Sequence, residues 1–180
     1  LAILATTVVL VLNPAQILAE SRDTQRLSDL GSVQSSIGLL LATATTTVTF
    51  GVIPQCSGPA GGTCAAADHG FTTATAGALN VSRSVNGTGW VGVNLTKTSG
   101  GSPISTLPID PQNTTTFHYN YMGDDTAKTY VLHARIESAK MAYSTMTSDG
   151  GDDNNCGTAA AVVYNADCWY EIGTDPDLNL

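Results

Sequence analysis

Histidines, hydroxyls and carboxylates are the groups in this 180-residue chain that could perform acid–base or nucleophilic chemistry. The three histidines, His69, His118 and His133, are dispersed, and no metalloprotease, nucleophile-elbow, P-loop or dinucleotide-binding motif occurs. His118 and His133 stand in strand-like runs, which indicates structural roles, and His69 is typical of a loop. We therefore predict that the protein is not an enzyme and uses no cofactor.

One acidic segment could bind a cation. Asp149, Asp152 and Asp153 are followed by Asn154 and Asn155, and carboxylate and amide oxygens are the ligands that Ca²⁺ prefers. Their spacing does not fit an EF-hand loop, and a solvated turn explains the same residues. We therefore predict no metal site, with calcium at this segment as the alternative.

The four cysteines form two local pairs. Cys56 and Cys64 bracket a loop rich in Gly and Pro, and Cys156 and Cys168 bracket a second segment near the C-terminus. This placement predicts two local disulfides, each contributing about 2.5–3 kcal/mol through loop closure. Free thiols are the alternative. Disulfides would place the protein in an oxidising location outside the cytosol.

Charge and composition exclude several functions. The chain carries 7 basic and 15 acidic residues, a net charge of −8, and its charged fraction is only 12%. Such a chain has no basic surface for nucleic acid, so we expect no sequence-specific nucleic-acid binding. An apolar fraction of 42% excludes wholesale disorder.

Four Asn-x-Ser/Thr sequons occur in the chain, at Asn80, Asn86, Asn94 and Asn113. In a chain this rich in threonine, such matches are expected by chance.

The first twelve residues are uncharged and strongly apolar. Burial of their eight large aliphatic side chains is worth about 12–24 kcal/mol. As a helix they would span about 18 Å, which is shorter than the hydrocarbon layer of a membrane. These aliphatic residues are Leu1, Ile3, Leu4, Val8, Val9, Leu10, Val11 and Leu12.

Pro14 interrupts this apolar head, and a helical pattern follows it. We predict one helix over residues 1–44, about 66 Å long and kinked at Pro14. Its rear part is amphipathic, with an apolar stripe of Leu27, Leu30, Val33, Ile37 and Leu41. The other sides carry Arg22, Asp23, Arg26 and Asp29, which indicate a solvated helix face.

Strand patterns follow the predicted helix. Threonine, valine and aromatic residues favour strands at residues 45–54, 90–95, 115–122, 129–136 and 168–172. The segment GDDTAK between the third and fourth of these is typical of a hairpin turn. One long helix packed on a small antiparallel sheet of three to five strands makes the fold class α+β.

The head, Pro14 and the segment NPAQILAESRDTQRLSDL together resemble type IV pilins and pseudopilins. The resemblance covers about residues 1–41 well and residues 105–180 loosely. The chain departs from the family because no Glu precedes Glu20, so we carry over no cleavage or methylation site. The family resemblance also implies sugars on Ser or Thr rather than Asn, with residues 43–49 and 72–75 as candidates.

The resemblance implies a filament subunit that polymerises through the apolar head and Pro14. Residues 1–24 would project for assembly, and residues 25–180 would form the globular domain. Arg22, Asp23, Arg26 and Asp29 could contact neighbouring subunits and set their register. The expected partners are copies of the chain itself and an inner-membrane assembly machinery.

The expected location is the cell surface, after anchoring in the membrane. Adhesion, motility and DNA uptake are all compatible uses. A pseudopilin of a type II secretion system is one alternative within the family. A membrane-anchored extracellular binding module, such as an adhesin domain, is the alternative from another class, although Pro14 argues against a straight anchor.

Overall fold

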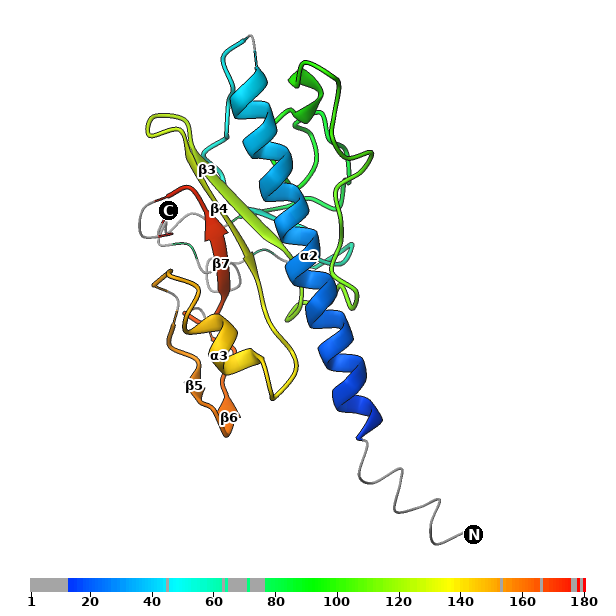
Figure 1. The fold of residues 1–180 in the computed structure, drawn as a ribbon, viewed down its shortest axis with the longest axis vertical. Helices are drawn as coiled ribbons and strands as arrows, with labels where there is room; N and C mark the ends of the chain where they lie inside the picture. The colour runs from blue at the N-terminus through cyan, green and yellow to red at the C-terminus, as the bar shows by residue number, and fades with distance from the viewer. Residues whose placement is uncertain are drawn as a thin grey trace, which may run out of the picture.

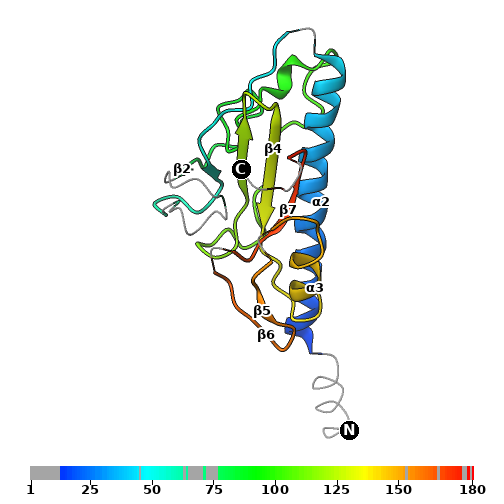
Figure 2. The ribbon, with the colours of Figure 1, turned by 90° about the vertical axis from the view of Figure 1, so that its left-hand side faces the viewer.

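A long helix packed against a five-stranded sheet organises the chain (Figure 1). The computed structural model describes residues 13–44, 46–62, 64, 71, 77–152, 154–165, 167–175, 178 and 180. The helix, α2 (Pro14–Thr43), runs alongside the sheet, and its first turns extend beyond the end of the sheet (Figure 2). The predicted α+β fold class is confirmed.

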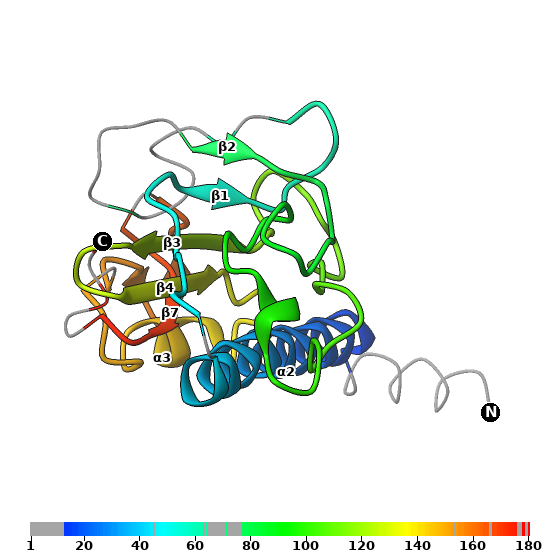
Figure 3. The ribbon, with the colours of Figure 1, turned by 90° about the horizontal axis from the view of Figure 1, so that it is seen from above.

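The sheet is mostly antiparallel. Its strands follow the order β2 (Ala78–Leu79), β1 (Gln55–Cys56), β3 (Asn120–Asp124), β4 (Thr129–Ala134) and β7 (Tyr170–Gly173). Among the described strand pairs of this sheet, β1 and β2 alone are parallel. α2 packs against β4 and β7, and β2 forms the edge farthest from the helix (Figure 3).

The β3–β4 hairpin follows the sequence prediction. Asn120 pairs with His133 and Asp124 with Thr129, so the two strands are joined by a four-residue turn over residues 125–128. The carboxylate of Asp124 accepts hydrogen bonds from the backbone N–H groups of the turn, and Lys128 closes it with φ 62°. Strands predicted at residues 115–122, 129–136 and 168–172 are confirmed, with bounds shifted by a few residues.

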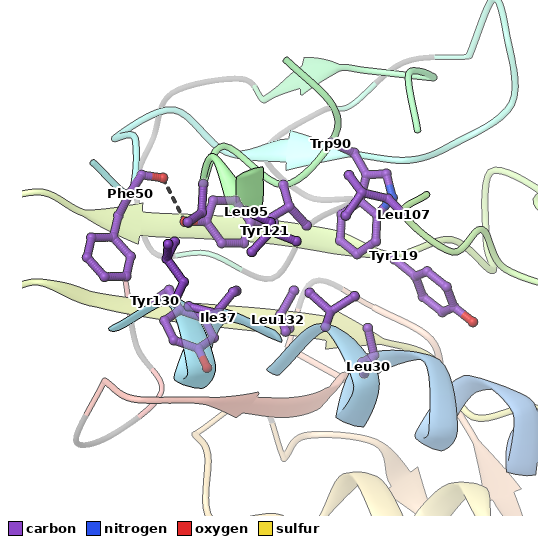
Figure 4. Close-up of a cluster of buried hydrophobic side chains, with 14 of the residues drawn as sticks. Leu30, Ile37, Phe50, Trp90, Leu95, Leu107, Tyr119, Tyr121, Tyr130 and Leu132 are labelled. Carbon is purple, nitrogen blue, oxygen red and sulfur yellow. Dashed lines mark hydrogen bonds between the residues drawn. The ribbon is translucent and has the colours of Figure 1, made fainter. Parts of the chain in front are cut away.

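The main core lies between α2 and the sheet (Figure 4). The buried stripe of α2 is Leu30, Val33, Ile37 and Leu40. It packs with tyrosines of β3 and β4 and with Leu132. Leu41, which the sequence analysis placed in this stripe, is 42% exposed, and Leu40 takes its place one residue earlier.

Two predicted strands are wrong. Residues 46–54 and 90–94 form loops, followed by the short strand β1 and the 3₁₀ turn η2 (Leu95–Lys97) respectively, and residue 45 lies outside the described residues. Their side chains enter the core individually: the Tyr121 hydroxyl donates to the Phe50 carbonyl at 2.7 Å, and the Trp90 indole donates to the Pro108 carbonyl at 2.9 Å. Apolar burial thus explains these residues without a strand ladder.

A second small core lies beside β7. It contains the helix α3 (Ala142–Met146), and the hairpin of β5 (Gly157–Thr158) and β6 (Ala161–Val162) packs nearby. The disulfide Cys156–Cys168 is buried in this core, and Cys56–Cys64 closes the loop after β1. Both predicted disulfide pairs are therefore present.

Candidate assembly site

The start of α2 carries the predicted interruption at Pro14. Pro14 is the first helical residue, where its missing N–H costs no hydrogen bond. Asn13 before it adopts a left-handed conformation with φ 38°, and its side chain accepts from the Gln16 N–H at 3.4 Å. Asn13 is therefore the N-cap residue at which α2 begins, and the helix predicted before it, with its kink, lies outside the described residues. The apolar residues 1–12 lie outside the described residues.

The first turns of α2 project from the rest of the molecule. Ile17 is 53% exposed and Leu18 is 58% exposed, whereas Ala19 is buried. Contact between the helix and the domain therefore begins near Ala19. The predicted boundary between residues 24 and 25 lies within the part of α2 that contacts the domain.

A buried ion network holds this part of α2 to the domain. The Arg26 guanidinium donates two hydrogen bonds to Asp110, at 2.6 and 3.0 Å, and one to Asp23 at 2.8 Å. Glu137 lies 3.3 Å from Arg26 and also accepts two hydrogen bonds from Arg22. The side chains of Arg26, Asp23 and Asp110 are fully buried. Two residues outside the helix, Asp110 and Glu137, are thereby held in place relative to α2.

Backbone donors complete the network. The Asp23 carboxylate accepts from the N–H groups of Glu137 and Ser138 at 2.8 and 2.7 Å. The Arg26 guanidinium also lies 4.8 Å from the centre of the Phe117 ring, within cation–π range. Each buried charge therefore has several partners, which is the condition for tolerating charges away from water.

The network changes the proton affinities of its members. Burial lowers the pKa of Arg26, but hydrogen bonds and charges from Asp110 and Asp23 outweigh this effect and raise it overall. The hydrogen bond from Arg22 is the main cause that lowers the pKa of Glu137. Arg26 and Glu137 therefore both keep their charges near neutral pH.

The solvated-face prediction is wrong for Asp23 and Arg26, because carboxylates far along the sequence surround them inside the domain. The predicted Asp23–Arg26 contact is present, but Asp29 pairs elsewhere. It accepts from the Tyr119 hydroxyl at 2.8 Å and from the Gln25 amide at 2.5 Å. Arg22, Asp23, Arg26 and Asp29 thus all have partners within the chain.

The sequence analysis missed Asp110 and Glu137. Each stands more than 80 positions from Arg26, so helix periodicity contains no information about them. The two arginines of α2 were the one indication in the sequence that distant carboxylates contact this helix, because a buried guanidinium requires carboxylate partners.

The opposite side of α2 has an unusual surface. None of the exposed residues of this helix is charged. We call the central part of this surface the outward face of α2; it consists of Ser21, Thr24, Gln25, Ser28, Ser32, Ser35, Gly38, Leu39 and Ala42. These positions recur at three- and four-residue steps, so they form one stripe opposite the buried one.

Three of the five hydroxyls of this face donate hydrogen bonds inside the helix. Thr24 donates to the Glu20 carbonyl at 2.9 Å, Ser32 to Ser28 at 2.8 Å and Ser35 to Gly31 at 2.8 Å. A Cβ atom at Gly38 would meet no heavy atom within 4 Å. Most side chains of this face are therefore short and uncharged, and several of its hydroxyls are hydrogen-bonded to carbonyls of the same helix. Another helix can approach such a face closely.

The acidic segment considered for calcium forms a turn. Asp149 accepts from the N–H groups of Gly151 at 3.1 Å and Glu171 at 2.9 Å, and burial raises its pKa to about 6. Asp152 is exposed, and Asp153 lies outside the described residues. Among the residues that the structure places, no group of three His, Cys, Asp or Glu side chains could hold a metal ion.

The placed histidines lie on the sheet face away from α2. His133 is buried, with its Nε2 3.2 Å from the Glu171 carboxylate on the neighbouring strand. His118 packs edge-on against Trp169, with ring centres 5.7 Å apart. Their burial agrees with the structural roles expected for them, and His69 lies outside the described residues.

Comparison with known proteins gives no relative: no family model, curated protein or solved structure matches this chain. Within the described residues, α2 and the other helices lack the combination of length and hydropathy needed to cross a membrane.

Proposed function

We propose that this protein is the structural subunit of an extracellular helical filament of the type IV pilus kind. Before assembly, the apolar residues 1–12 would anchor it in the membrane. During assembly by an inner-membrane machinery, these residues would leave the lipid and pack with those of neighbouring subunits. In this proposal, the α+β domain corresponds to the globular part of a pilin subunit.

The observation that carries the proposal is the uncharged outward face of α2. A helix face that stays in water normally carries charged residues, whereas this one presents serine, threonine, glycine, alanine and leucine. The charged residues of α2 are instead half-buried or buried against the domain. Such a distribution favours a helix that is covered on both sides, once by its own sheet and once by neighbours.

The projecting start of α2 supports the same arrangement. Ile17 and Leu18 are exposed where the helix leaves the domain, and the sequence continues before them into the apolar head. Their burial requires lipid or other subunits, because the domain does not reach them. A head-to-tail contact that does not close into a ring would extend the assembly into a filament.

The two disulfides agree with an extracytoplasmic location. A pseudopilin of a secretion system would use the same helix and the same outward face. It would differ by forming a short polymer in the periplasm, which the threonine-rich, lysine-poor composition favours less than a surface filament.

A binding module is the second candidate, because the described residues line a pocket at the surface of the domain. It has a volume of about 340 Å³ and is lined by Phe50, Val52, Ile53 and Tyr121 among others. Val52 and Ile53 beside it are more than half exposed. This candidate leaves the uncharged outward face of α2 unexplained, so the filament subunit is the better account.

Immunogold electron microscopy of sheared cell-surface material tests the proposal. We expect thin filaments labelled along their length by antibodies against residues 13–180, and none from cells that lack the gene. Labelled chain confined to the periplasm would favour the pseudopilin. Chain recovered only as a membrane-bound monomer would favour the binding module.

A further inference from the structure

The four sequons, which the proposed function leaves unused, differ sharply in their structural environment. From this difference, we infer that Asn86 is an N-glycosylation site and that Asn80, Asn94 and Asn113 are not. The sugar donor is an oligosaccharide carried on a lipid diphosphate. An N-glycan is bulky and hydrophilic, so its asparagine must lie at the surface with its amide nitrogen available.

Asn86 meets these requirements. It is exposed, as is Thr88, and Gly87 between them is half-buried. The Asn86 Oδ1 accepts from the Thr88 hydroxyl at 2.7 Å, the Thr88 N–H at 3.1 Å and the Ser84 hydroxyl at 2.8 Å. These bonds fix the carboxamide by its oxygen, and within the described residues its Nδ2 donates no hydrogen bond.

The local backbone presents this sequon as a turn. Gly87 has φ 87°, a left-handed conformation that glycine adopts without strain. A Cβ atom at this position would lie 3.3 Å from the Gly92 carbonyl oxygen, so a larger residue would crowd the backbone of this turn. An isolated β-bridge between Asn86 and Asn94 closes the base of this loop.

Asn80 serves a structural purpose instead. Its Nδ2 donates to the Gln55 side chain at 3.3 Å and to the carbonyls of Thr88 and Gly89 at 3.2 and 2.9 Å. A sugar on this nitrogen would remove bonds that hold the loop bearing Asn86.

The other two sequons are poorly accessible. Asn94 is half-buried and is followed by Leu95, which is fully buried in the main core. A transferase would have to extract Leu95 to reach this sequon. Asn113 is half-buried, with φ 46°, and its Oδ1 is buried without a hydrogen-bond partner among the described residues.

The reaction is a glycosyl transfer without any redox change. The Asn86 Nδ2 attacks the anomeric carbon of the sugar, and a C–N bond forms. The bond between that carbon and the diphosphate oxygen breaks, so the lipid diphosphate leaves with the bonding electron pair. The nitrogen gives one proton to a base of the transferase.

Peptide mass spectrometry of the full chain from its native cells tests this site. Trypsin should release residues 84–97, which contain Asn86 and Asn94, and chymotryptic cleavage after Trp90 separates the two. Electron-transfer fragmentation keeps a sugar on its own residue. We expect the sugar mass on Asn86, and an unmodified peptide containing Asn80.

Four variants sharpen the test. Asn86→Gln and Thr88→Ala should both remove the sugar completely, the second because the sequon requires the hydroxyl. Thr88→Ser and Asn94→Gln should retain it. An unmodified Asn86 in the wild-type chain, a sugar on Thr88 or Asn94, or a Thr88→Ala chain still modified at Asn86 would each overturn the assignment. Filament formation does not enter this readout, so the site and the proposed function can fail separately.

Discussion

Arg26 lies where the long helix meets two distant segments of the chain. Its guanidinium binds Asp23 on the same helix, Asp110 before β3 and Glu137 after β4. A complete buried ion network adds little net stability, because desolvation offsets the attraction between the charges. Loss of one member is different, because the remaining charges stay in the interior without compensation.

Replacement of Arg26 by Met should therefore lower the free energy of unfolding by about 3–5 kcal/mol, because Asp23 and Asp110 lose their cation. Urea denaturation of a chain comprising residues 13–180 measures this change. Arg22→Met is the matched control. The Arg22 side chain is 29% exposed, so its loss should lower the free energy of unfolding far less than the loss of Arg26 does. Equal losses in the two variants would show that the Arg26 network does not hold the helix in place.

Asp149 should make stability fall as the pH rises from about 4 to 6. Burial raises its pKa from 3.8 to about 6 in the folded chain, although N–H groups of Glu171 and Gly151 oppose this shift. Between these two values the folded state binds more protons than the unfolded state, so the free energy of unfolding decreases with rising pH. Glu137, whose pKa is lowered, contributes the opposite slope.

Asp149→Asn isolates the contribution of Asp149. The decrease in stability between pH 4 and 6 should be smaller in this variant than in the wild-type chain, measured by urea denaturation at several pH values. The exposed Asp152 provides the control, because Asp152→Asn should leave the profile unchanged. Parallel profiles for Asp149→Asn and the wild type would mean that this carboxyl titrates normally.

At the scale of the element, α2 has two faces with different tasks. One face fills the main core through Leu30, Val33, Ile37 and Leu40. The outward face carries no charge and has small side chains through most of its length. If neighbouring helices cover this face in a filament, a charge placed on it would be buried without a partner.

Ser32→Glu places a charge at the centre of the outward face. We expect loss of filaments, because the carboxylate would be desolvated between subunits. The isolated domain should change in stability by less than about 0.5 kcal/mol, because Ser32 is exposed and Glu favours helices. Ser32→Ala should keep filaments. Normal filament yield from the Ser32→Glu chain would place this face in solvent.

The elements that sequence reasoning identified correctly depend on local patterns. The rear part of α2 shows a three- and four-residue periodicity, and the β3–β4 hairpin joins alternating strands by a polar turn. The loops of residues 46–54 and 90–94 have strand-forming composition, but Phe50, Trp90 and their neighbours are buried by long-range contacts instead. The outward face was not predicted, because the charges of α2 were assigned to a solvated side of the helix, whereas Asp23 and Arg26 are buried.

For the whole molecule, the central question is where the globular part begins. Ala19 is the first buried residue of α2, and Asp23 binds the backbone of Glu137 and Ser138. A chain of residues 13–180 keeps all these contacts and should sediment as a soluble monomer. A chain starting at Gln25 lacks Arg22 and Asp23, so it should unfold at a lower urea concentration. Equal midpoints for the two chains would move the boundary back to residue 25.

The apolar head should be required for assembly and dispensable for folding. Val9→Asp in the full chain would place a charge among apolar neighbours, so filaments should be lost while residues 13–180 stay folded. Electron microscopy of sheared material and protease resistance of the domain measure the two effects. Val9→Leu is the matched control and should assemble normally. Filaments from the Val9→Asp chain would exclude a shared apolar core.

A helical reconstruction of the native filament by cryo-electron microscopy tests the central claim most directly. We predict that residues 1–12 of many subunits surround the filament axis, that neighbouring helices cover Ser28, Ser32 and Ser35, and that the sheet faces outward. A filament in which these three serines contact solvent would contradict this account. So would native surface material in which the chain occurs only as a monomer.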